Sequence, residues 1–305
     1  MLAIVIPYYN FKYFNNTLDS LAKQTDKRFN VYIGDDASSV NPLTLLNTYQ
    51  DKFNFIYKRF STNLGGTSLV KQWERCIALS DNEEWLMILG DDDVLDVNCV
   101  ASFYKSLEKI KEYNCNVVRF ASRYVDKDGI SLANYKDYLH PKIELATNSY
   151  YQHFLGESRS SLSEYLFKRE CYQKYQFYDF PLAWHSDDKA WLDYTQCGEL
   201  YTINEAVVNV RLSNDNISGR SDNLALKNKA RYLFFEDVVF NKLLHFKRYQ
   251  KITLLLEFGI LIKKQHKINL KNTLYVIFQF IKIGAFYSLL KFLRRMFIAK
   301  FKNKN

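Results

Sequence analysis

Three groups of polar side chains carry the residues best suited to chemistry, and each group comes just after an apolar run. They are Pro7-Tyr8-Tyr9-Asn10, Asp35-Asp36-Ala37-Ser38 and Asp91-Asp92-Asp93. Adjacent carboxylates repel one another, and a divalent cation is the natural compensator because Mg²⁺ and Mn²⁺ prefer hard oxygen ligands. Mg²⁺ usually takes only one or two carboxylates and completes its shell with water and phosphates. The third group therefore suits a site for a metal ion and a diphosphate.

The two acidic groups also have purely structural interpretations. Asp91-Asp92-Asp93 could cap a helix that begins near Val94, because Asp is favoured at a helix N-cap and in the first turn. Asp35-Asp36 could belong to a turn or an N-cap. On a shared edge of a sheet, however, a carboxylate of this group could accept the N3–H of uracil or thymine, or ribose hydroxyls. Both interpretations are open at this point.

Alternating strands and helices are expected to position these groups. Apolar runs predict strands, and helical periodicity predicts the helices between them. The strands are expected at residues 2–6, 29–33, 54–57, 84–89 and 116–121, and the helices at 14–22, 42–49, 67–79 and 97–112. This alternation predicts an α/β fold with a mostly parallel sheet covered on both faces. Because such sheets bind ligands at the carboxyl ends of their strands, we expect the three groups to converge on one rim.

In order and spacing, the motifs resemble those of family-2 glycosyltransferases of the GT-A fold. That family typically reads I-V-I-P-x-Y-N, then D-D-x-S, then L-D-x-D-D. Here the three stand as Ile4-Val5-Ile6-Pro7-Tyr8-Tyr9-Asn10, Asp35-Asp36-Ala37-Ser38 and Leu89-Gly90-Asp91-Asp92-Asp93. The resemblance implies a Rossmann-like GT-A catalytic domain over residues 1–215, with a nucleotide-binding half at 1–121 and an acceptor-binding half at 122–215.

Carried over position by position, the resemblance implies a role for each motif. The Pro7-Tyr8-Tyr9-Asn10 motif would flank the base, and Asp36, with Asp35 beside it, would contact the uracil-like edge. Asp92, together with Asp93, would ligate Mn²⁺ or Mg²⁺. Gly90 stands where the family usually has its first Asp, so the ribose and second metal contacts would fall to Asp91 or Asp93.

Two further segments resemble parts of a donor site. Asn63-Leu64-Gly65-Gly66 resembles the family's N-x-G loop, and the helix after it carries Lys71, which could lie near the diphosphate or simply on the surface. A strand predicted at residues 200–210 precedes Arg211, where relatives usually carry Arg-x-His. The chain reads Arg211-Leu212-Ser213, which leaves Arg211 as a diphosphate partner or as a structural ion pair.

Trp184-His185-Ser186-Asp187-Asp188 looks like the family's E-D element near the acceptor site. In an inverting transfer the acceptor hydroxyl must lose its proton to a carboxylate. By position Asp188 would be this general base, with Asp187 as the second choice, and helix capping is the structural alternative. Trp184, with His185 beside it, could stack on an acceptor sugar or belong to the core.

The net charge of +9 is concentrated at the carboxyl end of the chain. Residues 258–305 contain eleven Lys and Arg and no Asp or Glu, so the rest of the chain is slightly acidic. The longest uncharged run in residues 273–299 and their flanks is 272–281, which is too short to span a bilayer. We therefore expect residues 216–305 to form a helical, basic appendage that lies on an anionic membrane surface. Packing on the catalytic domain or in a homodimer is the alternative.

The sequence disfavours several other classes of protein. No G-x-x-x-x-G-K-[ST] phosphate loop, no nucleic-acid-binding module and no C-x-x-C metal motif is present. The five scattered cysteines are typical of cytosolic thiols, and we expect no cleavable secretion signal. A cytoplasmic protein peripheral to the inner membrane face is expected.

The resemblance, together with these features, implies a metal-dependent inverting glycosyltransferase. It would move a hexose or N-acetylhexosamine from a nucleotide-diphosphate donor, with a UDP-sugar favoured. The acceptor would be a growing, lipid-linked cell-surface polysaccharide such as O-antigen or capsule. The alternative is a non-catalytic glycan-binding or scaffold protein on the same fold.

Overall fold

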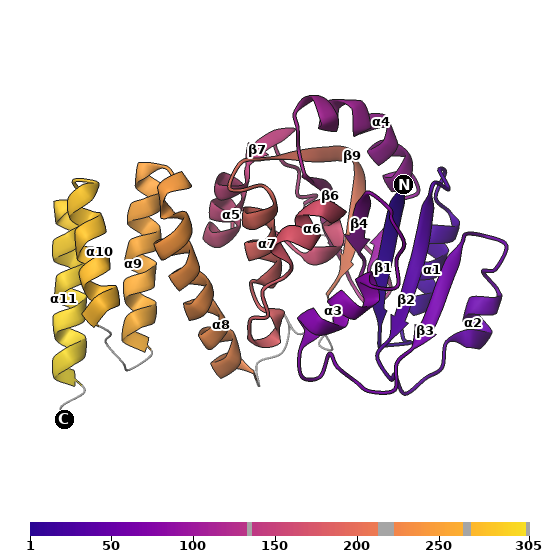
Figure 1. The fold of residues 1–305 in the computed structure, drawn as a ribbon, viewed down its shortest axis with the longest axis horizontal. Helices are drawn as coiled ribbons and strands as arrows, with labels where there is room; N and C mark the ends of the chain where they lie inside the picture. The colour runs from indigo at the N-terminus through magenta and orange to yellow at the C-terminus, as the bar shows by residue number, and fades with distance from the viewer. Residues whose placement is uncertain (133–135, 213–222, 265–269, 303–305) are drawn as a thin grey trace. The chain divides into compact units, whose positions relative to one another are not determined.

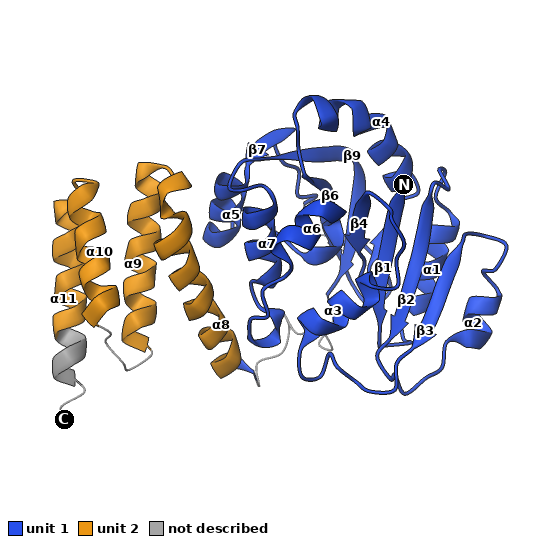
Figure 2. Cartoon of the chain, viewed as in Figure 1, with its two compact units in different colours: residues 1–223 blue, residues 224–305 orange. Residues whose placement is uncertain are grey.

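A computed structural model describes residues 1–132, 136–212, 223–264 and 270–302, with side chains described up to residue 297 (Figure 1). The chain divides into two compact units, Met1–Asn223 and Leu224–Asn305 (Figure 2). The domain boundary expected at 215/216 lies outside the described residues. Each unit is considered by itself below.

Within its described residues, unit 1 is built on one nine-stranded mixed sheet with the order β3-β2-β1-β4-β8-β6-β9-β5 and with β7 paired to β9. The first half is parallel, as the alternation predicted, and comprises β1 (Leu2–Tyr8), β2 (Phe29–Asp35), β3 (Phe55–Arg59) and β4 (Trp85–Ile88). The other strands are β5 (Val94–Leu95), β6 (Val117–Val125), β7 (Ile143–Leu145), β8 (Tyr165–Lys168) and β9 (Glu199–Arg211). Antiparallel pairs join β8 to β4 and β6, and join β9 to β5 and β7.

Period-2 alternation in β1 distributes its side chains between two cores. Leu2, Ile4 and Ile6 pack with the apolar faces of α1 (Phe14–Ala22), α2 (Leu43–Asn47) and α4 (Cys99–Glu112). α3 (Leu69–Ile77) contacts β1 and β2 from the other face. Pro7 is tolerated because it lies beyond Val5–Ile88, the last pair that β1 forms with β4.

The second half of unit 1 packs around aromatic rings. Its helices are α5 (Ala146–Leu155), η1 (Leu162–Glu164), α6 (Arg169–Tyr175), η2 (Pro181–Ala183) and α7 (Ser186–Tyr194). The Phe177 ring contacts those of Trp73, Phe167 and Trp191, at centroid distances of 5.4, 5.7 and 6.4 Å. This cluster ties α3, β8 and α7 together, which fixes the start of α7 relative to the sheet.

Unit 2 is helical. Its elements are α8 (Leu224–Asp237), η3 (Val238–Lys242), η4 (Leu243–His245), α9 (Arg248–Lys264), α10 (Leu270–Lys282) and α11 (Phe286–Lys302). Phe240 and Tyr275 stack at 4.3 Å, and Gly259 lets the Phe292 ring approach α9 closely. Over the described residues, no helix combines the length and apolarity that a membrane span requires.

Candidate functional site

The carboxyl ends of β1, β2 and β4 bring the three polar groups together (Figure 1). Asp91 Oδ2 accepts hydrogen bonds from the backbone N–H groups of Tyr9 and Asn10, both at 2.7 Å. The backbone N–H of Asp36 donates to the carbonyl oxygen of Tyr8 at 2.9 Å. Loops that are distant in sequence are thus joined at one rim, as expected for strand ends of a parallel sheet.

Only part of the Pro7-Tyr8-Tyr9-Asn10 motif lies at this rim. Tyr9 and Asn10 are exposed, and Pro7 is half-buried at the end of β1. The Tyr8 ring is fully buried, packs on Phe14 at 4.5 Å and donates its hydroxyl to the Val40 carbonyl. Burial raises the pKa of Tyr8 to about 12. Tyr8 is therefore a core residue whose backbone alone lies at the rim.

Asp35 is a buried residue that stabilises the loop at the end of β2. Its Oδ2 accepts from the Tyr57 hydroxyl at 2.7 Å and from Arg59 Nη1 at 2.9 Å, and its Oδ1 accepts from the Ser38 N–H at 2.8 Å. The last bond closes the turn that was the structural alternative for this residue. Because Asp35 is fully buried, it holds the loop in place and presents no free surface.

Asp36 fixes the loop that carries Gly65. Its two carboxylate oxygens accept from the N–H groups of Leu64 at 2.6 Å and Gly65 at 2.9 Å, and Arg75 forms an ion pair with Oδ1. A Cβ at Gly65 would meet Asp36 Oδ2 at 2.6 Å, so only glycine allows this approach. Arg75 comes from α3 and also donates to the Thr62 carbonyl at 2.9 Å. A carboxylate and a guanidinium therefore stand side by side at the end of β2.

Lys71 lies in the first turn of α3, where its backbone N–H is capped by Ser68 Oγ at 3.1 Å. Its side chain is exposed. Ser68 also donates to Asp179 at 2.8 Å, which links this loop to the second half of the unit.

The Asp91-Asp92-Asp93 group is followed by β5, so the helix-cap interpretation is wrong for it. β5 pairs with β9, and that long-range ladder overrides the local capping preference. Asp93 is buried and its Oδ1 accepts from the Arg211 N–H at 3.0 Å, while Asp92 is only half-buried. A Cβ at Gly90 would lie 3.0 Å from Asp93 Oδ2 and 3.2 Å from Asp92 Oδ1. These two carboxylates therefore converge on the space that the missing Gly90 side chain leaves.

Burial raises the pKa of Asp91 to about 6, against the lowering effect of the Asn10 and Tyr9 N–H groups. Burial also raises the pKa of Asp93, while Ser163 and Arg211 oppose the rise. Over the described residues, no group of three or more His, Cys, Asp or Glu side chains could hold a metal ion by itself. Any cation at this rim would need ligands from water or from a bound molecule.

Arg211 binds backbone carbonyl groups next to the acidic residues. Its guanidinium donates to the carbonyl oxygens of Asp92 at 3.1 Å, Asp126 at 2.7 Å and Lys127 at 2.8 Å. It also lies over the Tyr13 ring at 4.3 Å. The Arg211 side chain is fully buried, and its hydrogen bonds hold the backbone at Asp92, Asp126 and Lys127 in place.

A second polar cluster stands at the start of α7. Asp188 is buried, and its two oxygens lie 3.3 Å from His153 Nδ1 and 2.7 Å from His185 Nδ1. Asp187 is half-buried, and its Oδ1 accepts from the Asp188 N–H at 2.9 Å. His185 has a left-handed backbone with φ of 71°, and its ring meets the half-buried Trp184 ring edge-on at 5.9 Å.

The two aspartates of this cluster have opposite pKa shifts. Burial and the adjacent Asp188 charge raise the pKa of Asp187 to about 7. Burial alone would raise the pKa of Asp188 as well, but His153 and His185 outweigh it and hold this pKa well below its usual range. The Asp188 charge likewise overcomes burial at His153 and raises its pKa to about 9. At neutral pH Asp188 is ionised, while Asp187 is poised to exchange a proton.

A series of alternating charges connects the Asp91-Asp92-Asp93 group with the Asp187-Asp188 cluster. Arg159 forms a buried ion pair with Glu164 and interacts with the Asp93 charge, and the Glu164 charge in turn raises the pKa of His153. Ser163 Oγ, in the same η1 turn, accepts from the Gly90 N–H at 3.0 Å. Sequence reasoning missed Arg75, His153, Arg159 and Glu164. Only the opposite charge of each residue's partner could have marked it; Arg75 and His153 have partners distant in sequence, and Arg159 and Glu164, five residues apart, lie in no recognised motif.

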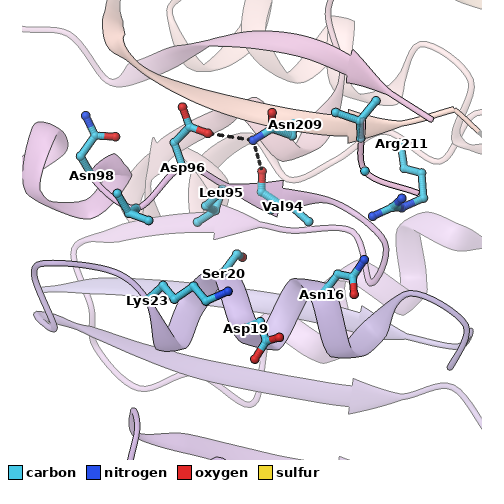
Figure 3. A pocket seen from close by; sticks show the side chains of 13 residues that line it. Asn16, Asp19, Ser20, Lys23, Val94, Leu95, Asp96, Asn98, Asn209 and Arg211 are labelled. Atoms are coloured by element: carbon cyan, nitrogen blue, oxygen red, sulfur yellow. Dashed lines mark hydrogen bonds between the residues drawn. The ribbon is translucent and has the colours of Figure 1, made fainter. Parts of the chain in front are cut away.

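One pocket of unit 1 is lined by neither the Asp91-Asp92-Asp93 group nor the Asp187-Asp188 cluster, although Val94 and Arg211 border it. It has a volume of about 490 Å³ and lies between α1 and β5. Figure 3 shows Asn209 bonded there to Asp96 and to the Val94 backbone, with Arg211 at one end. Its polar lining is largely engaged in such bonds within the fold.

Comparison of the sequence with known proteins finds similarity to glycosyltransferases. The sequence model described as glycosyl transferase family 2 matches residues 3–169. Poly(ribitol-phosphate) beta-N-acetylglucosaminyltransferase TarS of Staphylococcus aureus (strain Mu50) is 27% identical over 139 residues, which is 44% of this chain and 23% of that protein. Glycosyltransferase GlyG of Streptococcus pneumoniae serotype 4 is 24% identical over 119 residues, which is 39% of this chain and 38% of that protein. The chain spans well under half the length of these curated relatives.

Solved structures show the same fold over nearly the whole chain. A crystal structure of S. aureus TarS 1-349 in complex with UDP-GlcNAc matches with a TM-score of 0.65 at 17% identity, covering 96% of this chain and 81% of that chain. The corresponding complex with UDP matches with a TM-score of 0.56 at 15% identity, covering 99% of this chain and 91% of that chain. The predicted α/β architecture with C-terminal helices is thereby confirmed.

Proposed function

This chain belongs to glycosyl transferase family 2, and from that membership we propose that it moves a hexose or N-acetylhexosamine from a UDP-sugar to a cell-surface glycan, with inversion at the sugar. The chain is a glycosyltransferase, and its structural neighbours were solved with UDP-GlcNAc and UDP. The acceptor in this proposal is a growing, lipid-linked polysaccharide of the O-antigen or capsule kind, reached from the cytoplasmic side of the membrane.

The pairing of Asp36 with Arg75 at the carboxyl end of β2 carries the choice of uridine. Uracil presents an N3–H donor beside carbonyl acceptors, so a carboxylate next to a guanidinium matches that edge. A carboxylate offers about four lone-pair sites, so Asp36 can accept the N3–H while it still holds the loop at Gly65. Tyr9, exposed at the end of β1, supplies a ring for the face of the base.

A divalent cation fits the neighbouring acidic group. Asp92 Oδ1 and Asp93 Oδ2 both lie next to the vacant Gly90 side-chain position. Two carboxylates suit Mn²⁺ or Mg²⁺ when a diphosphate and water supply the other ligands. When bound, such an ion neutralises charge on the leaving diphosphate. Asp91 is committed to the Tyr9 and Asn10 backbone, so Asp92 and Asp93 would hold the ion.

Asp187 is the better general base of the acidic pair. The family motif pointed first to Asp188, but both oxygens of Asp188 contact histidines and its pKa is low. Asp187 is more accessible and has a pKa of about 7, which is matched to proton transfer near neutral pH. In the transfer, the acceptor oxygen bonds to the anomeric carbon, the bond to the UDP oxygen breaks, and the acceptor proton moves to Asp187. The Asp188 N–H donates to Asp187 Oδ1 and keeps it in position, while His153 and His185 hold the Asp188 side chain.

Nucleotide release from a panel of donors tests this function. Full-length protein with Mn²⁺ would be incubated with UDP-GlcNAc, UDP-glucose, dTDP-glucose and GDP-mannose, and free nucleoside diphosphate would be measured. We expect release from a UDP-sugar, and a loss of roughly 10²- to 10⁴-fold in Asp187→Asn. Asp128→Asn, on an exposed turn of the same unit, is the matched control. A wild-type protein that neither binds nor cleaves any of the four would indicate the non-catalytic alternative.

A further inference from the structure

Two helices of unit 2 expose large apolar side chains in a regular pattern. On α10 and α11 these side chains recur at intervals of three, four or seven residues, which places them on one side of each helix. Each is more than half exposed, from 51% at Ile281 to 66% at Leu290. We call them the exposed stripe: Leu274, Phe278, Ile281, Phe286, Leu290 and Phe297.

The exposed stripe is not part of the core of unit 2. The other sides of the same helices supply that core through Val276, Phe280 and Phe292, all fully buried. Phe280 and Phe292 meet at 5.8 Å, and Phe292 packs against Gly259 of α9. Each helix therefore has two apolar sides, of which the bundle uses only one. An exposed apolar surface of this regularity is typical of an interaction site.

The charge around the exposed stripe indicates what covers it. Residues 258–305 contain eleven Lys and Arg and no acidic residue. Lys282, Lys291 and Arg294 are exposed on the same helices as the stripe. Helices with an apolar side bordered by cations lie in the interface of anionic bilayers, where apolar burial and attraction to lipid headgroups act together.

We propose that the exposed stripe inserts into the interface of an anionic lipid bilayer, with α10 and α11 lying along the membrane surface. A second copy of the chain is the poorer occupant, because a two-fold contact through this surface would bring the same cations face to face. Nucleic acid would satisfy the charge but would leave the apolar side chains in water. The proposal concerns unit 2 and does not depend on the reaction that unit 1 performs.

Vesicle co-sedimentation of the full-length protein tests the proposal. One set of vesicles contains phosphatidylcholine with about 30% phosphatidylglycerol, which supplies the anionic surface, and the other is pure phosphatidylcholine. The wild type should pellet with the anionic set only. Phe278→Glu/Leu290→Glu should abolish pelleting, whereas Leu244→Glu, at a 77% exposed position of η4 outside the exposed stripe, should behave as wild type. Lys291→Gln/Arg294→Gln should weaken the partition about fivefold per residue.

Two results would overturn the proposal. The first is a helical wild-type protein, by circular dichroism, that fails to pellet with anionic vesicles. The second is sedimentation velocity showing a stable dimer that Phe278→Glu/Leu290→Glu splits without any change in vesicle binding, because a second copy would then cover the exposed stripe. Donor cleavage by unit 1 should be equal in all variants, so a failed transferase hypothesis remains distinguishable from a failed membrane hypothesis.

Discussion

Replacing His153 with Gln tests how the α7 cluster controls proton transfer. His153 Nδ1 lies 3.3 Å from Asp188 Oδ1, and its raised pKa of about 9 keeps it cationic at neutral pH. That positive charge lowers the pKa of Asp187, which burial and Asp188 raise to about 7. The glutamine side chain would keep a hydrogen-bond donor but lose the charge, so the pKa of Asp187 should rise.

The size of the effect follows from the charge that is removed. An opposite charge at close range changes a pKa by roughly 1–3 units, and His153 contacts Asp188 directly instead of Asp187, so we expect a shift of about one unit. A general base works when deprotonated, so the acid limb of kcat/KM should move upward by about one pH unit. Activity at pH 6 should fall about tenfold, while activity at pH 9 should change little.

The assay is UDP release from the active UDP-sugar as a function of pH. His245→Gln, an exposed histidine of unit 2, is the matched control and should leave the profile unchanged. If the acid limb of His153→Gln coincides with that of the wild type, the electrostatic link from His153 to the base is refuted. A profile without an acid limb near pH 7 in the wild type would remove Asp187 as the base.

Three further outcomes are expected. Gly65→Ala should weaken UDP binding about tenfold by calorimetry, because its Cβ would come within 2.6 Å of Asp36 Oδ2 and displace the loop; unchanged affinity would separate this loop from the donor. Arg75→Gln should cost roughly 1.5–3 kcal/mol of UDP affinity but leave inorganic diphosphate affinity intact, because its guanidinium would contact the base. Finally, the melting temperature should fall by roughly 5 °C between pH 6.5 and pH 9. The raised pKa of His153 stabilises the folded protein fully below pH 6.5, and this stabilisation is lost as the pH rises through about 9. A flat wild-type curve, or an equally steep one in His153→Gln, would contradict that origin.

The sequence was sufficient to predict the rim because local patterns determine it. Each acidic group follows an apolar run, and the carboxyl ends of neighbouring parallel strands meet at one edge. Asp91 and Asp36 accordingly contact the end of β1. The two-residue β5 could not be predicted, because its strand conformation depends on pairing with β9, more than a hundred residues later.

The division of roles within the acidic pair was likewise beyond sequence reasoning. Asp187 and Asp188 are the same residue type and differ only in the side chains that surround them. His153 reaches Asp188 from α5, and Glu164 acts on His153 from η1. These contacts come from tertiary packing and leave no local periodicity or motif. The same reason hid Arg75, whose helix position resembles that of any surface arginine until its ion pair with Asp36 is seen.

Calorimetric titration with nucleotides tests the central claim most directly. Full-length protein would be titrated with UDP, dTDP, GDP and CMP, with and without Mn²⁺, beside an Asp92→Ala variant. We expect UDP to bind in preference to GDP and CMP, and binding to weaken when either Mn²⁺ or the Asp92 carboxylate is removed. Absence of binding by every nucleotide in a folded protein would contradict the account of the rim as the site of a nucleotide-sugar donor.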